Sequence, residues 1–241
     1  MQQQRRKGAC DTIVTTSYFE DPLMQVTQAV HKRSSIRAFT DQPVSNALIR
    51  ELIEGASRAP SGGNVQPWQL YVLNEDAMTR FKQHVLEHPR REAPAYAIYP
   101  ENLKEPYRSA RFEVGEMMYA LLEIPREDKA ARLQRLAQNF QFFGAPAGFF
   151  CFIDQQMGPP QWSDLGVFLQ TFMLLATEAG LATCAQEAWA TKPQTVAEYV
   201  GAPPESMLFC GMAIGYEDTE AAVNSLKSNR FPVESFTTFM T

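Results

Sequence analysis

The sequence predicts an α+β protein in which helices dominate, folded as a single domain over residues 21–241. Three observations support this prediction. Helical stripes and short apolar runs follow one another along the 241 residues without a regular β-α-β alternation. Apolar residues make up 45% and charged residues 20% of the chain, as is usual for a globular protein. The sequence shows no internal repeat, linker or low-complexity block that would divide it further.

The first part of the chain predicts three helices and one strand. Residues 1–20 lack periodicity and are predicted to be a loose leader. Apolar residues spaced as on one helical face predict helices over 23–33 and, after an N-cap at Ser45, over 48–56. A strand is predicted over 69–74 and an amphipathic helix over 75–87. The proline-rich segment 89–106 is predicted to be irregular, as binding loops and lids often are.

The second part of the chain predicts four helices and three strands. Helices are expected over 107–123 and 127–143, followed by a buried strand over 147–153 and a loop over 154–161. Ser163 is predicted to cap a long apolar helix that ends at Gly180. A short strand over 182–186, a helix with Pro193 in its first turn, and a strand over 207–216 complete the pattern.

Composition and charge exclude several classes of protein. The net charge of −5 does not suggest nucleic-acid binding, and the most apolar stretch, 165–181, is too short and polar for a good membrane span. The N-terminus lacks the apolar core of a signal peptide, so a soluble cytoplasmic protein is expected. The four cysteines have no metal-ligand spacing, and His84 and His88 have no third ligand nearby. We therefore expect no metal site.

A basic and hydroxyl run follows the first helix, at Arg33-Ser34-Ser35-Ile36-Arg37. In an extended segment, alternate residues face the same way, so Arg33, Ser35 and Arg37 would converge on one object. A phosphate suits such a set, because it accepts several charge-assisted hydrogen bonds and arginine donates them in pairs. The alternative interpretation is a solvated helix end whose basic residues face the C-terminal dipole.

A glycine-rich loop lies between the second helix and the first strand, at Pro60-Ser61-Gly62-Gly63-Asn64-Val65-Gln66-Pro67-Trp68. Adjacent glycines allow the backbone to approach a planar ligand closely. Asn64 and Gln66 carry both donors and acceptors, which suits a ligand with a polar edge of both kinds. An ordinary turn that leads into a strand is the alternative. Two weaker motifs are Glu187-Ala188, which follows a short strand, and Arg230 near the C-terminus.

Several common signatures are missing. No GxGxxG motif opens a helix after the first strand, and no GxxxxGK[ST] motif occurs, so the Rossmann and P-loop classes are not predicted. No GxSxG motif occurs, and the three histidines have no evident nucleophile partner.

Taken in order over residues 25–235, these motifs resemble the FMN-dependent nitroreductase family. The segments 102–108 and 161–164 are similar to its nitrobenzoate-reductase-like branch. The resemblance implies a central mixed, mainly antiparallel sheet flanked by helices. It also implies an intertwined homodimer with FMN at the subunit interface and NAD(P)H as co-substrate.

The resemblance also implies roles for particular residues. The FMN phosphate and ribityl chain would be held by Arg33, Ser34, Ser35, Arg37 and Arg230. The partner subunit would present to the flavin ring Pro60, Ser61, Gly62, Gly63 and Asn64, with Gln66 also near its polar edge. A backbone N–H near Glu187 or Ala188 would donate to flavin N5. Two positions depart from the family pattern: Ala188 replaces a common glycine, and Ser228, beside Lys227, replaces a common basic residue.

The implied reaction is a ping-pong transfer of hydride from NAD(P)H, through the flavin, to a small electron-poor acceptor such as a nitroaromatic or a quinone. No side-chain acid or nucleophile is required, and Arg37 is a candidate for stabilising the reduced flavin. The acceptor is expected to meet aromatic side chains, with Tyr107 and one of Phe140, Phe142 and Phe143 as candidates. Arg108 and Arg111 could meet a carboxylate, but a solvated helix face is the preferred interpretation of both.

Three other functions remain open at this stage. The same scaffold could serve as an enone reductase, a flavin reductase or a reductive dehalogenase. It could also bind flavin without catalysis, as a redox sensor, or lack a cofactor and act as a helical interaction domain. The sequence does not select the acceptor, the extent of nitro reduction, or NADH over NADPH.

Overall fold

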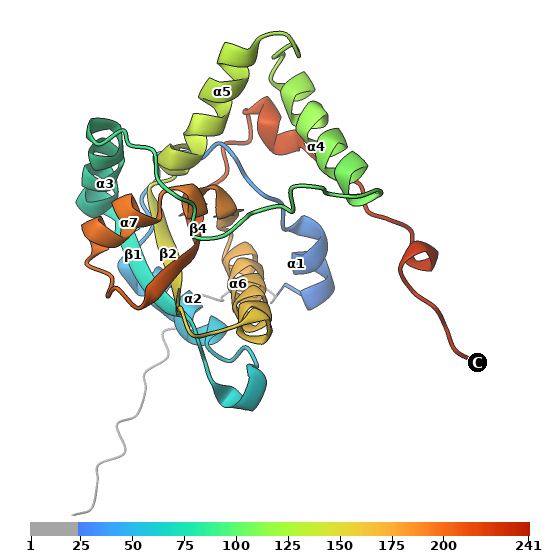
Figure 1. The fold of residues 1–241 in the computed structure, drawn as a ribbon, viewed down its shortest axis with the longest axis horizontal. Helices are drawn as coiled ribbons and strands as arrows, with labels where there is room; N and C mark the ends of the chain where they lie inside the picture. The colour runs from blue at the N-terminus through green and yellow to red at the C-terminus, as the bar shows by residue number, and fades with distance from the viewer. Residues whose placement is uncertain (1–23) are drawn as a thin grey trace, which may run out of the picture.

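The computed structural model describes residues 24–241, so the predicted leader over 1–20 lies outside the described residues. Seven α-helices occur in this part of the chain (Figure 1). Their bounds are α1 Val26–Lys32, α2 Asn46–Ala56, α3 Glu75–Glu87, α4 Tyr107–Leu121, α5 Lys129–Ala137, α6 Pro159–Glu178 and α7 Pro193–Val200. Short 3₁₀ helices are η1 Gly62–Asn64, η2 Gln138–Gly144, η3 Glu187–Thr191, η4 Ala222–Ser225 and η5 Val233–Ser235.

Four strands form one sheet in the order β1-β2-β4-β3, and every neighbouring pair is antiparallel. Their bounds are β1 Gln69–Asn74, β2 Ala147–Asp154, β3 Ala182–Gln186 and β4 Ser206–Gly215. Within residues 24–241, the predicted parallel component is limited to one isolated bridge, between Ser35 and Thr183. The bounds of β1, α3 and β3 are those predicted from the sequence, and those of β2 and β4 differ by one residue.

Both faces of the sheet are covered, which explains why β2 is apolar throughout. Successive side chains of a strand point to opposite faces. Phe149 and Cys151 of β2 therefore pack against α2 and α6, whereas Phe150 and Phe152 pack against α3, η2, η3 and α7. Figure 1 shows α6 and α2 on one side of the sheet, with α3 and α7 on the other.

A bulge in β4 interrupts this alternation of side chains between the two faces of the sheet. Cys151 pairs with Cys210 but the next residue of β2 pairs with Leu208, which leaves Phe209 as the extra residue. The carbonyl of Phe209 accepts a hydrogen bond from the hydroxyl of Tyr96. The irregular segment 88–106 is thereby fixed against the sheet.

Glycine is required at position 211 of β4 by the packing of Trp189. A Cβ atom at Gly211 would lie 2.3 Å from Cδ1 of Trp189, which is far inside van der Waals contact. Trp189 is fully buried and packs against the rings of Phe81, Phe142 and Phe150. The chain after β3 is therefore held flat against the sheet.

Two predicted helix boundaries are wrong. The helix expected to start at a Ser163 cap starts instead at Pro159, because Gly158 serves as its N-cap and Pro159 and Pro160 occupy the first turn, where proline is favoured. The helix expected over 127–143 ends at Ala137. Phe142 and Phe143 adopt left-handed φ values of 50° and 53°, which a helix cannot contain.

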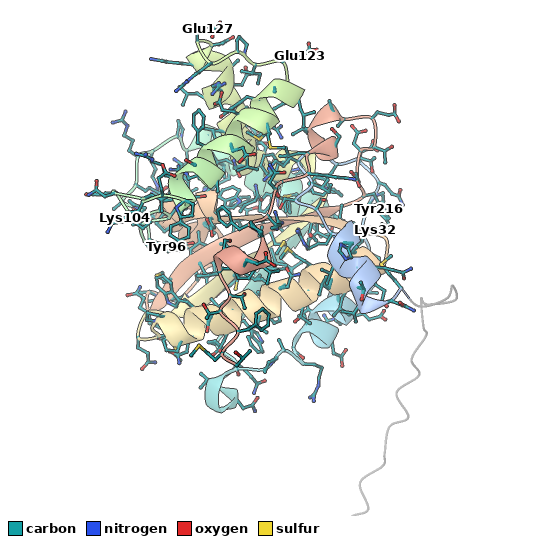
Figure 2. The ribbon with its side chains drawn as sticks, turned by 90° about the vertical axis from the view of Figure 1, so that its right-hand side faces the viewer. Lys32, Tyr96, Lys104, Glu123, Glu127 and Tyr216 are labelled. Carbon is teal, nitrogen blue, oxygen red and sulfur yellow. The ribbon has the colours of Figure 1, made fainter. Side chains whose placement is uncertain are left out.

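Helices α4 and α5 form a hairpin that projects from the body of the molecule (Figure 1). Figure 2 shows Glu123 and Glu127 at its tip. Neither helix has a buried residue, and a salt bridge of 2.5 Å between Arg132 and Glu116 joins them.

The C-terminal segment runs past α4 and then leaves the body (Figure 1). Asn229 is hydrogen bonded to Glu113 of α4, at 2.5 Å. Beyond it, large apolar side chains stay exposed at Phe231, Val233, Phe236, Phe239 and Met240. Within residues 24–241, no helix is both long and apolar enough to cross a membrane.

Candidate active site

The basic run after α1 is an extended segment along β3. The backbone N–H of Ile36 donates to the carbonyl of Thr183 at 3.0 Å, and Ser35 forms its bridge to the same residue. This pairing brings Arg33, Ser35 and Arg37 to one hollow of about 890 Å³, as the sequence predicted from their spacing. The hollow is also lined by Ser34, Lys227, Ser228 and Arg230.

This first hollow is strongly positive. No carboxylate is among its lining residues, whereas five of them are cationic: Lys32, Arg33, Arg37, Lys227 and Arg230. Burial lowers the pKa of Arg33, and the neighbouring charge of Arg230 lowers it further. Within residues 24–241 none of the five forms a salt bridge. An anion such as a phosphate would offset part of this positive charge.

Ser228 lies beside Arg230 in the wall of the first hollow. Its hydroxyl and carbonyl oxygens accept hydrogen bonds from Nη1 of Arg230, at 2.7 and 3.1 Å. Ser228 therefore orients Arg230, and Lys227 beside it lines the hollow as a further positive charge.

A second hollow of about 430 Å³ adjoins the first and shares Arg37, Val114 and Leu226 with it. We call the two together the groove. The wall of the second hollow comes from the end of β3 and η3, the inner faces of α4 and α5, and the segment 88–106. Its residues include Tyr99, Arg111, Arg135, Phe143, Glu187 and Ala188.

The Glu187-Ala188 pair is held at the groove by Trp189 on one side and Gln186 on the other. Gln186 is buried, and its amide donates to the carbonyl of Asn139 at 2.8 Å. The two anchors fix the backbone of Glu187 and Ala188 along the groove wall. Burial raises the pKa of the Glu187 carboxyl.

The segment 88–106 is anchored by a buried carboxylate, Glu92. Its side chain has no exposed surface and accepts hydrogen bonds from the backbone of Gln194 and Thr195, at 2.6 and 3.1 Å. The Thr195 hydroxyl and Arg90 also donate to it. Burial alone would raise the pKa of Glu92, but these donors hold the pKa below its usual range. Glu92 thus caps α7, and the segment goes on to place Tyr99 in the groove wall.

The loop over residues 60–66 lies away from the groove. None of its residues lines either hollow, and those from Gly62 to Gln66 are exposed. The loop contacts α6, where the Asp164 carboxylate accepts from the N–H of Gly62 at 3.2 Å. Just after the loop, Trp68 stacks on Phe168 of the same helix. In Figure 1 this turn lies at the bottom of the view, whereas α4 and α5 are at the top. A single chain therefore does not bring the loop to the cationic end of the groove.

The aromatic residues that line the groove differ in part from those predicted to meet an acceptor. Phe142 has no exposed surface and packs in the core against Phe81 and Phe150, so its position contradicts the prediction that it faces an acceptor. Its neighbour Phe143 lines the second hollow instead. Tyr107 is 61% exposed at the start of α4 and lines neither hollow.

Two residues that line the groove, Tyr99 and Arg135, were not predicted from the sequence. Tyr99 lies under the guanidinium of Arg111, whose Cζ is 3.9 Å from the ring centroid. Arg135 comes from the last turn of α5 and lines the groove beside Arg37. No local signal marks either residue, because the sequence around each resembles an ordinary exposed loop or helix.

Residues 30–216 match the model of the nitroreductase family. The chain belongs to the nitroreductase family. The prediction made from the order of the motifs is therefore confirmed.

Two curated relatives of this nitroreductase act on nitroaromatic compounds by name. A 4-nitrobenzoate reductase from Pseudomonas putida is 37% identical over 212 residues, which are 88% of this chain and 93% of the relative. A nitrobenzene nitroreductase from Ectopseudomonas oleovorans is 32% identical over 233 residues, 93% of this chain and 98% of the relative. Both agree with the predicted branch of the family.

Solved structures share the fold. The FMN- and NADPH-dependent nitroreductase NfnB from sphigopyxis sp. strain HMH superposes with a TM-score of 0.87 at 42% identity, covering 90% of this chain and 100% of the other. NfnB from Mycobacterium smegmatis, solved in complex with NADPH, superposes with a TM-score of 0.83 at 28% identity, with the same coverage.

The residues of the groove fit FMN. A phosphate needs several charge-assisted donors without a competing carboxylate, and the first hollow provides them from two distant parts of the chain. A flat ring needs an apolar wall with a few polar groups, and the second hollow offers Phe143, Met118 and Ile98 beside three guanidiniums and a carboxyl.

Proposed function

We propose that this chain is an FMN-dependent oxidoreductase that takes a hydride from NAD(P)H and reduces nitroaromatic compounds of the nitrobenzoate or nitrobenzene class. The observation that carries the proposal is the groove, in which five cations without a carboxylate at one end adjoin an apolar wall at the other. The names of the relatives and of the similar solved structures support the same reaction.

The groove residues divide into two sets. Arg33, Ser34, Ser35, Arg37 and Arg230 would hold the phosphate and ribityl chain, and the backbone N–H groups of Glu187 and Ala188 would face N5 of the ring. When bound, FMN supplies a two-electron carrier that accepts hydride and passes electrons to the nitro group.

The remaining residues shape the place where the acceptor would lie. Phe143 and Met118 provide apolar surface that excludes water from the ring. Reduction of a nitro group to a nitroso group takes up two protons and releases water. The raised pKa of Glu187 keeps a proton on its carboxyl at a higher pH than an exposed glutamate would. Glu187 is therefore suited to hold one proton at the edge of the groove.

We also propose that the active form is a homodimer, in which the loop over 60–66 of one subunit meets the groove of the other. Two features support this. The loop is exposed and makes no contact with the groove of its own chain, and the C-terminal segment carries apolar side chains away from the body. A second copy would complete the polar edge of the site with Asn64 and Gln66 and cover these side chains.

The proposed reaction is tested by anaerobic titration of the purified protein. The visible spectrum should be that of a flavin, it should bleach on addition of NADPH or NADH, and it should return when 4-nitrobenzoate is added. A flavin that does not bleach would indicate binding without catalysis. A colourless protein that fails to take up FMN would contradict the proposal altogether.

The shared site is tested by complementation between two defective chains. Arg33→Glu disables the groove, and Gly62→Phe disables the loop without crowding its own chain, since a Cβ atom at Gly62 would meet only Asp164 Oδ2, at 3.9 Å. Neither variant alone should retain FMN. A one-to-one mixture of co-folded chains should recover about a quarter of the wild-type FMN content, because half of the dimers are mixed and each has one intact site. Mixed dimers that bind no FMN would show that the loop and the groove do not share a site.

A further inference from the structure

Arg135 is placed in the groove without a partner of opposite charge. It lies in the last turn of α5, and its Nη2 donates to the backbone carbonyl of Arg37 at 3.1 Å. Its Cζ lies 5.1 Å from the centroid of the Phe143 ring. These contacts direct the guanidinium into the second hollow, beside the wall formed by Glu187 and Ala188.

The hydrogen-bonding capacity of Arg135 is largely unused. Its Nε is buried and has no hydrogen-bond partner among the described residues. Arg132, one turn earlier on the same helix, is by contrast fully engaged, with Glu116 accepting two hydrogen bonds at 2.5 and 3.1 Å. A buried donor without a partner weakens a fold, and an acceptor on a bound ligand would satisfy it.

The charges around Arg135 also favour the binding of an anion. Burial lowers the pKa of Arg135, and the nearby charge of Arg37 lowers it further, while Cys184 and Tyr119 act in the opposite direction. Glu187 is the only carboxylate that lines the second hollow, and it forms no hydrogen bond or salt bridge with Arg135 in residues 24–241. The guanidiniums of Arg37 and Arg135 are thus close enough to repel each other, and neither forms a salt bridge within residues 24–241.

An anion beside Arg135 would be distinct from the phosphate. Of the cations proposed to hold the phosphate and ribityl chain, Arg33 and Arg230 line the first of the two hollows and Arg37 lines both, whereas Arg135 lines only the second. The second hollow is where the proposed function places the flavin ring. Hydride transfer adds two electrons and one proton to that ring, so its net charge becomes one unit more negative.

We propose that Arg135 acts with Arg37 as a pair of cations that stabilises the negative charge gained by the flavin ring on two-electron reduction. The proposal rests on the proposed function, since it assumes that FMN occupies the groove. Arg135 would then favour the reduced over the oxidised form of the cofactor, because a positive charge near the ring stabilises its anionic state. In this role Arg135 sets a redox property and contributes little to the binding of oxidised FMN.

The test is the midpoint potential of bound FMN in the holoenzyme, compared between wild type and Arg135→Met. Methionine keeps an apolar stem against Phe143 and removes the charge. The ratio of the affinities for reduced and oxidised FMN should fall about tenfold, which for a two-electron couple is about 30 mV more negative. The dissociation constant for oxidised FMN should change by less than about threefold.

Two further variants keep the test decisive. Arg135→Lys, which retains a charge, should recover most of the potential, and it also serves if the methionine variant folds poorly. Arg132→Met, on the same helix but paired with Glu116, should leave the potential unchanged. An unchanged potential in a folded Arg135→Met holoenzyme, or an equal loss of affinity for both forms of FMN, would overturn the inference. A wild-type protein that binds no FMN would instead overturn the proposed function.

Discussion

The cationic end of the groove and the loop over residues 60–66 differ in how the chain holds them. The groove end is assembled from two distant segments, which meet through the bridge of Ser35 to Thr183 and the placement of Arg230. The loop is hydrogen bonded to the neighbouring helix through Asp164, and its residues from Gly62 to Gln66 are exposed. One chain therefore assembles all five cations of the first hollow by itself, whereas its loop reaches neither hollow.

The largest expected effect comes from removing the cations of the groove. Arg33→Ala and Arg230→Ala should each weaken FMN binding by about 1.5–3 kcal/mol, since each removes charge-assisted hydrogen bonds to the phosphate. The apo-protein should not lose stability in either variant, because the two guanidiniums repel each other in the absence of an anion. Quenching of flavin fluorescence gives the affinity, and thermal unfolding of the apo-protein gives the stability.

The matched control is Arg58→Ala, which removes an exposed arginine just after α2, outside the groove. Its FMN affinity should equal that of the wild type. Equal losses in Arg58→Ala and Arg33→Ala would mean that overall charge, and not the groove, governs binding.

The next largest effect is a loss of stability at Glu92, which anchors the segment 88–106 of the groove wall. Glu92→Gln should lower the free energy of unfolding by about 1–3 kcal/mol at pH 7, because buried donors lose a charged acceptor. The pKa of Glu92 is lowered in the folded state, so this stabilisation is present above the ordinary pKa of about 4.3 and is lost as the pH falls through the folded value. Denaturant unfolding of both proteins from pH 7 to pH 3 should therefore show the difference shrinking.

Removal of the acceptor that holds the loop, Asp164, should lower the free energy of unfolding by less than Glu92→Gln does. Asp164→Ala removes the acceptor for the exposed N–H of Gly62 and should lower the free energy of unfolding by less than about 1 kcal/mol. Such a variant should still bind FMN less well if the loop meets the cofactor in a second subunit. A loss of stability as large as that of Glu92→Gln would show that the loop is as firmly held as the groove.

The smallest effect is expected at Glu187. Because its pKa is raised by burial, the folded state binds its proton more tightly, and stability declines as the pH rises from the ordinary value through the folded value. Glu187→Gln should therefore match the wild type near pH 4 and exceed it slightly at pH 8, by less than about 1 kcal/mol. Melting temperatures at the two pH values measure this; a variant less stable at pH 8 would contradict it.

Local patterns predicted the fold well where the chain's own periodicity decides the structure. The helix over 75–87 and the strands over 69–74 and 182–186 follow directly from spacing and capping residues. The basic run was also visible, because its five residues are adjacent in sequence. Arg230 was predicted as a phosphate ligand only from its place in the family pattern.

Tertiary packing decided the positions that the sequence analysis missed. The stripe over 127–143 continues into Phe142, but the core admits this ring only if the backbone turns left-handed. Arg132 and Arg135 are both arginines of one exposed helix, and only the three-dimensional structure shows that Arg132 is paired while Arg135 enters the groove. Sequence spacing contains no information that separates them.

Gly211 limits how this enzyme can be redesigned. The indole of Trp189 occupies the space that any side chain at position 211 would need, so a substitution there must lift η3 away from β4. That shift would push Glu187 and Ala188 into the second hollow and make it shallower. Gly211, which lines neither hollow, thus limits the depth of the second hollow, and variants that widen the groove should be sought in α4 and α5 instead.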